Sequence, residues 1–150
     1  NKAVMMAWKA GFLLLLMAPF AAFALAPGDV ISARRDGLKA AGHHMDRIEA
    51  LLDQRGDTRA AVAPTAEMIR FFEGLPALFP PNSGAGDTRA RPTIWSDPVG
   101  FAAANANMLT SLRSLENAAT TGDRATFQAA FQQAAATCSA CHRPFRSRAR

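Results

Sequence analysis

The 150-residue sequence has few side chains that bind metals through a thiolate or an imidazole: two cysteines, Cys138 and Cys141, and three histidines. A zinc site built on this pair and His142 would need a fourth ligand, and apart from His43 and His44 no cysteine or histidine remains to supply it. The sequence also has no sustained strand-like alternation, no internal repeat and no low-complexity tract. These absences disfavour a zinc domain, a β-sheet protein and a repeat protein.

The charge balance is only mildly positive. The 17 basic and 12 acidic residues give a net charge of +5, and two of the lysines fall in the first ten residues, which leaves +3 for the rest. Four arginines crowd the C-terminus, at Arg143, Arg146, Arg148 and Arg150, whereas a nucleic-acid surface would interleave basic and aromatic residues along an element. We therefore expect a solvated basic tail and no nucleic-acid partner.

The first residues have the three parts of a secretory signal: lysines, an uncharged run over 10–27, and the small residues Ala24 and Ala26. We expect 1–26 to be the signal, although Pro27 directly after the cleavage site makes that bond a poor peptidase substrate. Cleavage after Ala24 is one alternative. An uncleaved anchor is another, although the run is short for a membrane span. Either alternative places 27–150 outside the cytoplasm, in a bacterial periplasm, and cleavage leaves it free of the membrane.

Beyond the signal, apolar residues recur at helical spacing in four blocks. The blocks cover about 29–53, 58–75, 97–121 and 123–146. Asp29 is the predicted N-cap of the first block, and Pro76 is predicted to end the second. Each block has one apolar stripe that we expect to face inward. The stripes are Ile31, Leu38, Ala41, Met45, Ile48 and Leu52; Val62, Ala66, Ile69 and Phe71 or Phe72; Phe101, Ala104, Met108, Leu112 and Leu115; and Phe127, Phe131, Ala134, Cys138, Cys141 and Phe145.

The segment 76–98 has five prolines and two glycines, so it cannot form one regular helix. Its Phe79, Ile94 and Trp95 are too apolar for a free linker, and we expect the segment to pack back onto the body. Short turns join the first predicted helix to the second and the third to the fourth. The pattern predicts an all-α protein in which 27–150 forms one antiparallel up-down-up-down four-helix bundle, with a long proline-rich loop between helices 2 and 3.

The string Cys138-Ser139-Ala140-Cys141-His142 has the C-x-x-C-H pattern of covalent haem attachment. Residues three and four apart share one face of a helix, so both thiols and the imidazole project together. The thiols can then add to the two vinyl groups along one porphyrin edge, while His142 reaches the iron. We predict one covalently attached haem c with His142 as a metal ligand.

Two other interpretations of the cysteine pair are a thioredoxin-like redox site and a simple disulfide. The redox site requires a strand followed by a helix, and no strand is predicted before Cys138. The predicted export and the helical setting both favour haem attachment.

The sequence resembles the class II cytochromes c, and within them the cytochrome c′ family, over about 30–146. Three motifs carry the resemblance. They are Cys138-Ser139-Ala140-Cys141-His142-Arg143-Pro144-Phe145-Arg146, the loop Leu75-Pro76-x-x-Phe79-Pro80 through Arg91-Pro92-Thr93-Ile94-Trp95, and Val30-Ile31-x-x-Arg34-x-x-x-Leu38.

The resemblance implies a five-coordinate, high-spin haem near one end of the bundle, with Leu38 covering the iron face opposite His142. Leucine neither ligates iron nor hydrogen-bonds a ligand, so a polar Fe–O₂ unit gains little there, whereas NO and, at high concentration, CO can still bind. Phe79, Phe101 and Phe131 are the candidates for the other pocket walls.

Two arginines also match the family. Arg146 matches a proximal arginine four residues after His142, where it can interact with the imidazole or a ligand. Arg34 matches a residue that pairs with a haem propionate, and the alternative is a solvated surface arginine. The sequence departs from the family at Phe145, where tyrosine is usual, so any hydrogen bond of that phenol is missing.

The function expected is NO and CO binding with a role in NO scavenging, together with possible electron exchange with an unidentified redox partner, in a homodimer. The alternative is a low-spin, six-coordinate electron-transfer cytochrome of the c-556 type. Leu38 occupies the place of its methionine ligand, Met45 lies about two turns away, and His43 or His44 would need a changed register. A peroxidase needs a distal acid-base group, which an aliphatic roof does not offer, so we expect no enzyme.

Overall fold

The computed structural model describes residues 26–148. Its helices are α1 (Pro27–Asp53), η1 (Thr58–Ala61), α2 (Val62–Gly74), η2 (Leu75–Leu78), α3 (Thr93–Ser96), α4 (Pro98–Thr121) and α5 (Arg124–Phe145), where η marks a 3-10 helix. No helix in this part of the chain is long and apolar enough to cross a membrane. The predicted signal, apart from Ala26, and Arg150 of the basic tail lie outside the described residues.

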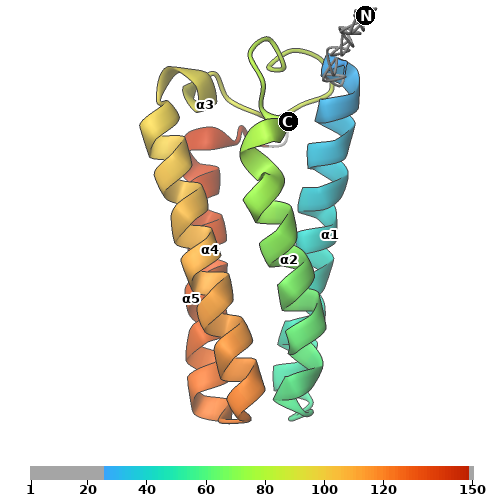
Figure 1. The fold of residues 1–150 in the computed structure, drawn as a ribbon, viewed down its shortest axis with the longest axis vertical. Helices are drawn as coiled ribbons and strands as arrows, with labels where there is room; N and C mark the ends of the chain where they lie inside the picture. The colour runs from blue at the N-terminus through green and yellow to red at the C-terminus, as the bar shows by residue number, and fades with distance from the viewer. Residues whose placement is uncertain (1–25, 149–150) are drawn as a thin grey trace, which may run out of the picture.

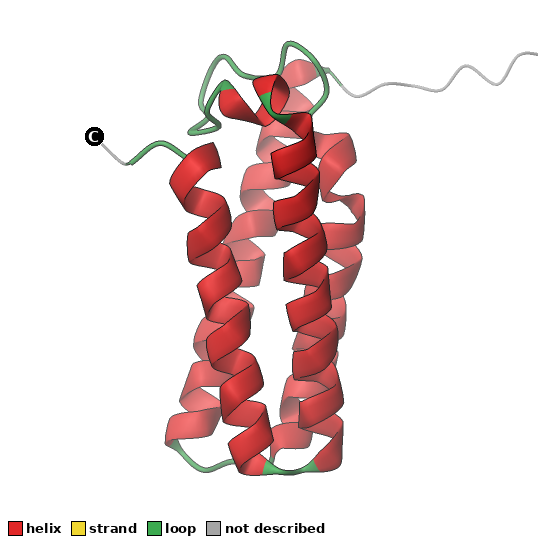
Figure 2. Ribbon diagram, turned by 90° about the vertical axis from the view of Figure 1, so that its left-hand side faces the viewer, coloured by secondary structure: helices red, strands yellow, loops and turns green. Residues whose placement is uncertain are grey.

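The four long helices α1, α2, α4 and α5 lie side by side, and each runs antiparallel to the one before it (Figure 1). The connection between α2 and α4 lies at one end of the bundle, and the two short turns lie at the other (Figure 2). The predicted all-α up-down-up-down bundle is therefore confirmed. This arrangement brings the proline-rich loop to the same end as the last turns of α5.

The second predicted helix, 58–75, is divided into η1, α2 and η2. Pro64 lies in the first turn of α2. Backbone N–H groups in the first turn have no acceptor within the helix, so proline, which lacks an N–H, is tolerated there. The α-helix ends at Gly74, one residue before the predicted end, and Pro76 lies within the first turn of η2, where proline is also tolerated. A proline therefore lies in the first turn of both α2 and η2, whereas η1 begins after the Asp57 cap.

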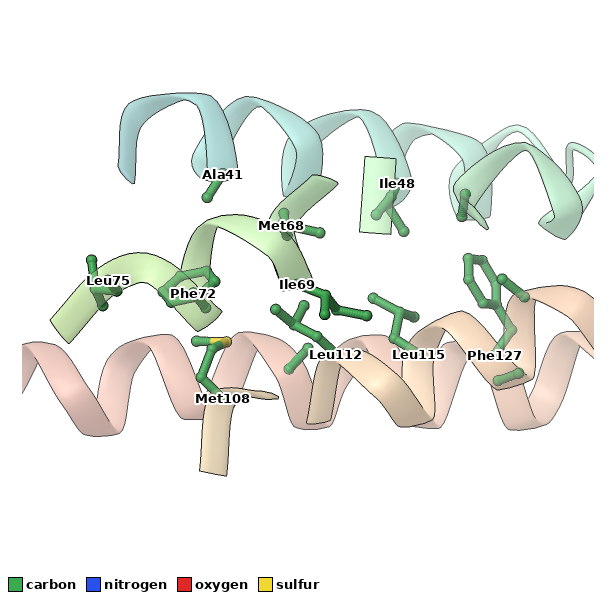
Figure 3. Packing of buried hydrophobic residues seen from close by; sticks show 14 of the residues in the cluster. Ala41, Ile48, Met68, Ile69, Phe72, Leu75, Met108, Leu112, Leu115 and Phe127 are labelled. Carbon is green, nitrogen blue, oxygen red and sulfur yellow. The ribbon is translucent and has the colours of Figure 1, made fainter. Parts of the chain in front are cut away.

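The middle of the bundle is a packed layer of apolar side chains (Figure 3). The largest apolar side chains that are fully buried are Ile48 on α1, Met68 on α2, Leu112 and Leu115 on α4, and Phe127 on α5, each 2% exposed or less. Four of these five come from the predicted inward stripes. This layer fixes the spacing of the four helices beneath the site.

The loop packs back onto the bundle, as its apolar residues predict. The Trp95 indole N–H donates to the carbonyls of Phe79 and Pro80, both at 3.1 Å. The Phe79 ring meets Phe101 of α4 edge to face, with 5.0 Å between the ring centroids. Ile94 is 5% exposed. The loop therefore closes one end of the bundle.

The same loop caps the C-terminal end of α5. The last four carbonyls of a helix lack partners within it, and here they belong to His142, Arg143, Pro144 and Phe145. Arg91 donates its backbone N–H to Phe145 at 3.0 Å and its guanidinium to Arg143 at 3.1 Å, and the Thr93 hydroxyl donates to Pro144. The Arg146 N–H donates to His142 at 3.0 Å. All four carbonyls are satisfied.

The C-terminal tail pairs with the loop. Arg146 forms an antiparallel bridge with Ala90, and the Ser147 N–H donates to the Arg89 carbonyl at 2.8 Å. The side chains of Arg146 and Arg148 are exposed, as the predicted solvated tail requires. Its backbone pairing is a long-range feature that the sequence pattern does not indicate.

The turn between α4 and α5 has a residue suited to each of its positions. Gly122 ends α4 with φ of 77°, in the left-handed region that favours glycine. The Asp123 carboxylate then accepts the Thr126 N–H at 2.8 Å and caps α5. This hydrogen bond lowers the pKa of Asp123 below its ordinary value.

Replacement of Asp123 by alanine is expected to lower the melting temperature, because the cap is lost. The lowered pKa means that the charged cap stabilises the fold above the ordinary aspartate pKa of about 4, and that this contribution is lost as the pH falls through the folded pKa. Asp123→Asn keeps a capping side chain without the titration. Melting curves between neutral and acid pH should therefore show a shallower acid dependence for Asp123→Asn than for the parent, and equal slopes would contradict this account.

Candidate functional site

The predicted attachment motif lies in the last turns of α5. Cys138 and Cys141 are three residues apart on one helical face, both thiols are free, and both side chains are half-buried. His142 follows on the same side, and its side chain is exposed. All three residues line one cavity, so the structure brings the two thiols and the imidazole together as the sequence predicts.

This cavity has a volume of about 960 Å³ and is bordered by α1, α2, α4, α5 and the loop. Packed protein interiors have few spaces larger than a water molecule, so a cavity of this size is a candidate binding site. The volume is at the upper end of the range for cofactor sites, and much of the wall is apolar. The cavity and its thiol and imidazole donors therefore fit a haem held at the edge of α5.

Electrostatics at the motif favour a ligating histidine over a reactive dithiol. Burial raises the pKa of the Cys138 thiol, and burial followed by the proximity of Cys138 raises the pKa of Cys141. Redox-active C-x-x-C thiols require the opposite shift. Desolvation, followed by the positive charge of Arg89, lowers the pKa of His142 and keeps its imidazole neutral, the form that binds a metal.

The predicted pocket walls all border the cavity: Leu38 from α1, Phe79 from the loop, Phe101 from α4 and Phe131 from α5. Phe101 is the best fixed of them, since its ring also meets Phe145 edge to face at 5.4 Å. Leu38 and Phe131 are half-buried and pack against the core. The structure places these four side chains together, and their contact with haem remains a prediction.

Arg34 is buried, with 2% of its surface exposed, so the alternative of a solvated surface arginine is wrong. One Nη donates to the Leu78 carbonyl at 3.1 Å and the Ser83 hydroxyl at 2.9 Å. The other Nη donates to the Ser83 carbonyl at 2.6 Å and the Thr88 hydroxyl at 2.9 Å. The guanidinium also stacks over Phe79, 4.4 Å from the ring centroid. Arg34 thus borders the cavity and clamps the loop to α1.

Arg146 borders the cavity near His142 but is not helical, because α5 ends at Phe145. The predicted helix, which ends at about Arg146, is one residue too long. Arg146 has an extended backbone and forms the bridge to Ala90. Arg89, which the sequence analysis missed, also borders the cavity and acts on His142. No local motif marks Arg89, since it reaches the site through the pairing of loop and tail.

The candidates for a sixth iron ligand differ in whether they border the cavity. Met45 borders the cavity. The His44 Nε2 lies 3.0 Å from a carboxylate oxygen of Glu67 on α2, and neither His43 nor His44 borders the cavity. Among residues 26–148, no three His, Cys, Asp or Glu side chains gather as a metal site.

A four-helix bundle whose last helix carries C-x-x-C-H beside a large, mainly apolar cavity defines the class of helical-bundle haem proteins. Within this class, the chain belongs to the cytochrome c′ family, because the family model described as Cytochrome C' matches residues 29–146. Membership implies a haem c cofactor. It also places the chain among haem proteins that are not enzymes in the usual sense.

Individual relatives agree with the family model. The chain is 34% identical over 122 residues to cytochrome c′ of Pararhodospirillum photometricum, which covers 80% of this chain and 98% of that protein. The crystal structure of cytochrome c′ from Rubrivivax gelatinosus matches with a TM-score of 0.74 at 29% identity, over 81% of this chain and 97% of that chain. A nitric oxide complex of a cytochrome c′ variant from Alcaligenes xylosoxidans matches with a TM-score of 0.75 at 26% identity, over 82% and 97%.

Proposed function

We propose that this protein is a five-coordinate, high-spin haem protein that binds NO and CO on the iron face opposite His142 and scavenges NO. The observation that carries the proposal is one cavity with the thiols and imidazole of α5 in one wall and the aliphatic Leu38 of α1 in another. The nitric oxide complex of a relative supports gas binding. The bound haem supplies the iron centre and its redox chemistry.

Cys138 and Cys141 would hold one haem covalently. Each S–H adds across one vinyl C=C, so that a C–S bond forms, the hydrogen goes to the neighbouring carbon, and no oxidant is consumed. Both thiols already lie on one helical face beside the cavity. Attachment at two points holds the group even when axial ligation is weak.

Leu38 would act as the roof over the vacant iron face. Its side chain offers neither a lone pair nor a proton, so it leaves the iron without a sixth protein ligand and gives no hydrogen bond to a bound gas. Such a site selects for ligands whose bond to iron needs no distal donor. NO and CO are of this kind, and bound O₂ is not.

On the other side, two arginines lie in the cavity wall together with His142. Arg146 and Arg89 border the cavity there, and Arg89 favours the neutral imidazole whose lone pair can bind iron. Arg34 remains the proposed partner of a haem propionate, since it borders the cavity near the loop. Its four hydrogen bonds to the loop give it a second task, which is to hold Phe79 in the wall.

Titration of the reduced protein with NO, followed by optical and EPR spectroscopy, tests this function. We expect a ferrous spectrum without the sharp α and β bands of a six-coordinate haem, and a stoichiometric change on NO addition. Leu38→Ala should raise the affinity for CO by about tenfold or more, because relief of crowding at a packed site is worth 1–3 kcal/mol. Leu109→Ala on α4, which packs against the core but does not border the cavity, is the control.

A second candidate function is electron transfer by a low-spin haem, favoured by the presence of Met45 in the cavity wall. Met45 lies seven residues beyond Leu38, about 10 Å along α1, so ligation by it requires a haem placed farther down the bundle. Sharp α and β bands in the reduced protein, lost in Met45→Leu, would establish this alternative and exclude the first.

We also propose a periplasmic homodimer that packs through α1 and α2, on the strength of the family resemblance. Sedimentation of the haem-loaded protein would measure its oligomeric state, and cell fractionation would measure its location. A monomer at micromolar concentration, or protein in the cytoplasmic fraction alone, would contradict these two points without affecting gas binding.

A further inference from the structure

The cavity is longer than the part of α5 that would hold the haem. Of the two cysteines, Cys138 is nearer to the start of α5, yet the cavity lining continues past it to Ala135 and Phe131. These residues lie about one and two helical turns before Cys138, about 5 and 10 Å along the axis. Helical side chains lean toward the N-terminal end of their helix, so the Phe131 ring lies farther still from Cys138.

The far part of the cavity, which we call the inner compartment, has apolar walls from three helices. They are Met45 of α1, Leu112 of α4, and Ala135 and Phe131 of α5. Leu112 is 1% exposed, and Ala135 and Phe131 are half-buried. None of these wall side chains has an N–H or O–H group that would hydrogen-bond a water molecule.

Beyond the inner compartment, the bundle is closed. Leu115 and Phe127 form the next layer, do not border the cavity, and are each 0% exposed. Figure 3 shows them beyond Leu112 along the bundle. On the α1 side, the exposed carboxylates of Asp46 and Glu49 border the cavity. The inner compartment is therefore a blind apolar pocket, continuous with the haem site and rimmed on α1 by acidic side chains.

We propose that the inner compartment is a second binding site, for small apolar gas molecules such as NO and CO, separate from the iron. Apolar cavities in proteins stay dry and accept apolar guests such as xenon, because water finds no hydrogen-bond partners in them. A gas molecule held here would lie next to the proposed haem site and would reach the iron without crossing solvent. The gas as occupant rests on the proposed function, whereas the apolar compartment rests on the described residues alone.

Xenon under pressure is the probe, applied to crystals of the haem-loaded protein. We expect a xenon atom bounded by Leu112, Phe131 and Ala135, and we expect Ala135→Leu to abolish it by filling the space. Ala136→Leu adds the same side chain one residue on, at an exposed position of α5 that does not border the cavity, and should leave the xenon in place. Absence of xenon from the parent, or its persistence in Ala135→Leu, would overturn the proposal.

A kinetic measurement follows the same site in solution. After flash photolysis of the ferrous CO complex, the fraction of CO recaptured without escape should fall under xenon pressure and in Ala135→Leu. It should be unchanged in Ala136→Leu. Equal recapture in the parent with and without xenon would contradict the proposal, even if xenon is seen in the crystal.

A second variant and a second measurement distinguish failure of the inner compartment from failure of the proposed function. If Ala135→Leu does not fold, Phe131→Trp fills the same compartment from the other wall residue of α5 and carries the same expectations. NO titration of each variant reports binding at the iron. Normal titration without a xenon site refutes the inner compartment and leaves the proposed function intact, whereas a xenon site without NO binding refutes the function and leaves the compartment.

Discussion

Complete loss of haem to acid–acetone extraction is the expected result when both Cys138 and Cys141 are replaced by alanine. In the double variant, haem would be held only by His142 and by apolar contacts with the cavity, and neither survives denaturation in acid. The parent, matured in a host with a cytochrome c assembly system, should retain all of its pigment on the polypeptide, because thioether bonds persist after unfolding.

The single variants and a neighbouring control make this result specific. Cys138→Ala and Cys141→Ala each leave one thiol for one vinyl group, so the haem should stay attached in both while its α band shifts. Ser139→Ala changes an exposed residue between the two cysteines and should behave as the parent does. Pigment that remains on the double variant after extraction would contradict covalent attachment through this pair.

Loss of about 3 kcal/mol in the free energy of unfolding is expected for Arg34→Met. The change removes four hydrogen bonds from a charged donor and leaves the buried carbonyl of Ser83 and the part-buried carbonyl of Leu78 without this partner. Methionine retains much of the apolar volume of the stem, so the loss reports the polar clamp more than a cavity. Burial lowers the pKa of Arg34 below its ordinary value, but the guanidinium still carries its charge at neutral pH.

Arg35→Met is the matched control, because it makes the same change at the next residue of α1. Arg35 forms an exposed ion pair with Asp87 of the same loop, and exposed pairs contribute about 0 to 1 kcal/mol. Urea denaturation of the haem-loaded proteins, followed by circular dichroism at 222 nm, gives both values. Equal destabilisation by the two substitutions would show that Arg34 does not clamp the loop.

The parts of the structure that sequence predicts are those written in local patterns. Apolar residues at helical spacing located all four long helices, because each stripe must face the core wherever the helix lies. The attachment motif was equally local: Cys138, Cys141 and His142 lie within five residues, and one helical turn brings them to one face. Phe79 and Trp95 predicted a packed loop, since exposed aromatic rings there would be unfavourable.

What sequence did not predict depends on contacts between distant segments. Ser83 and Thr88 become partners of Arg34 across 49 and 54 residues, through hydroxyls that carry no distinguishing pattern. Arg89 reaches the site only because the loop pairs with the tail. The division of the second helix has a local cause instead, since Pro64 lies in the first turn of α2 and Pro76 in the first turn of η2.

The length of the cavity was hidden for a different reason. Leu112 and Phe131 belong to stripes that a filled core would also require, and periodicity cannot distinguish a residue that touches another side chain from one that borders space. Only the placement of four helices in three dimensions separates the two situations.

The capping of α5 by the loop has a consequence for backbone motion at His142, the proposed iron ligand. The final turn of a helix normally frays, and its amide protons then exchange with solvent in brief local openings. Here Arg91 and Thr93 bind the carbonyls of Arg143, Pro144 and Phe145, so unwinding of that turn requires release of a segment about 50 residues earlier in the chain. In the proposed haem complex, the lifetime of the iron–imidazole bond would therefore depend on detachment of the loop, and slow hydrogen exchange at the end of α5 would be its signature.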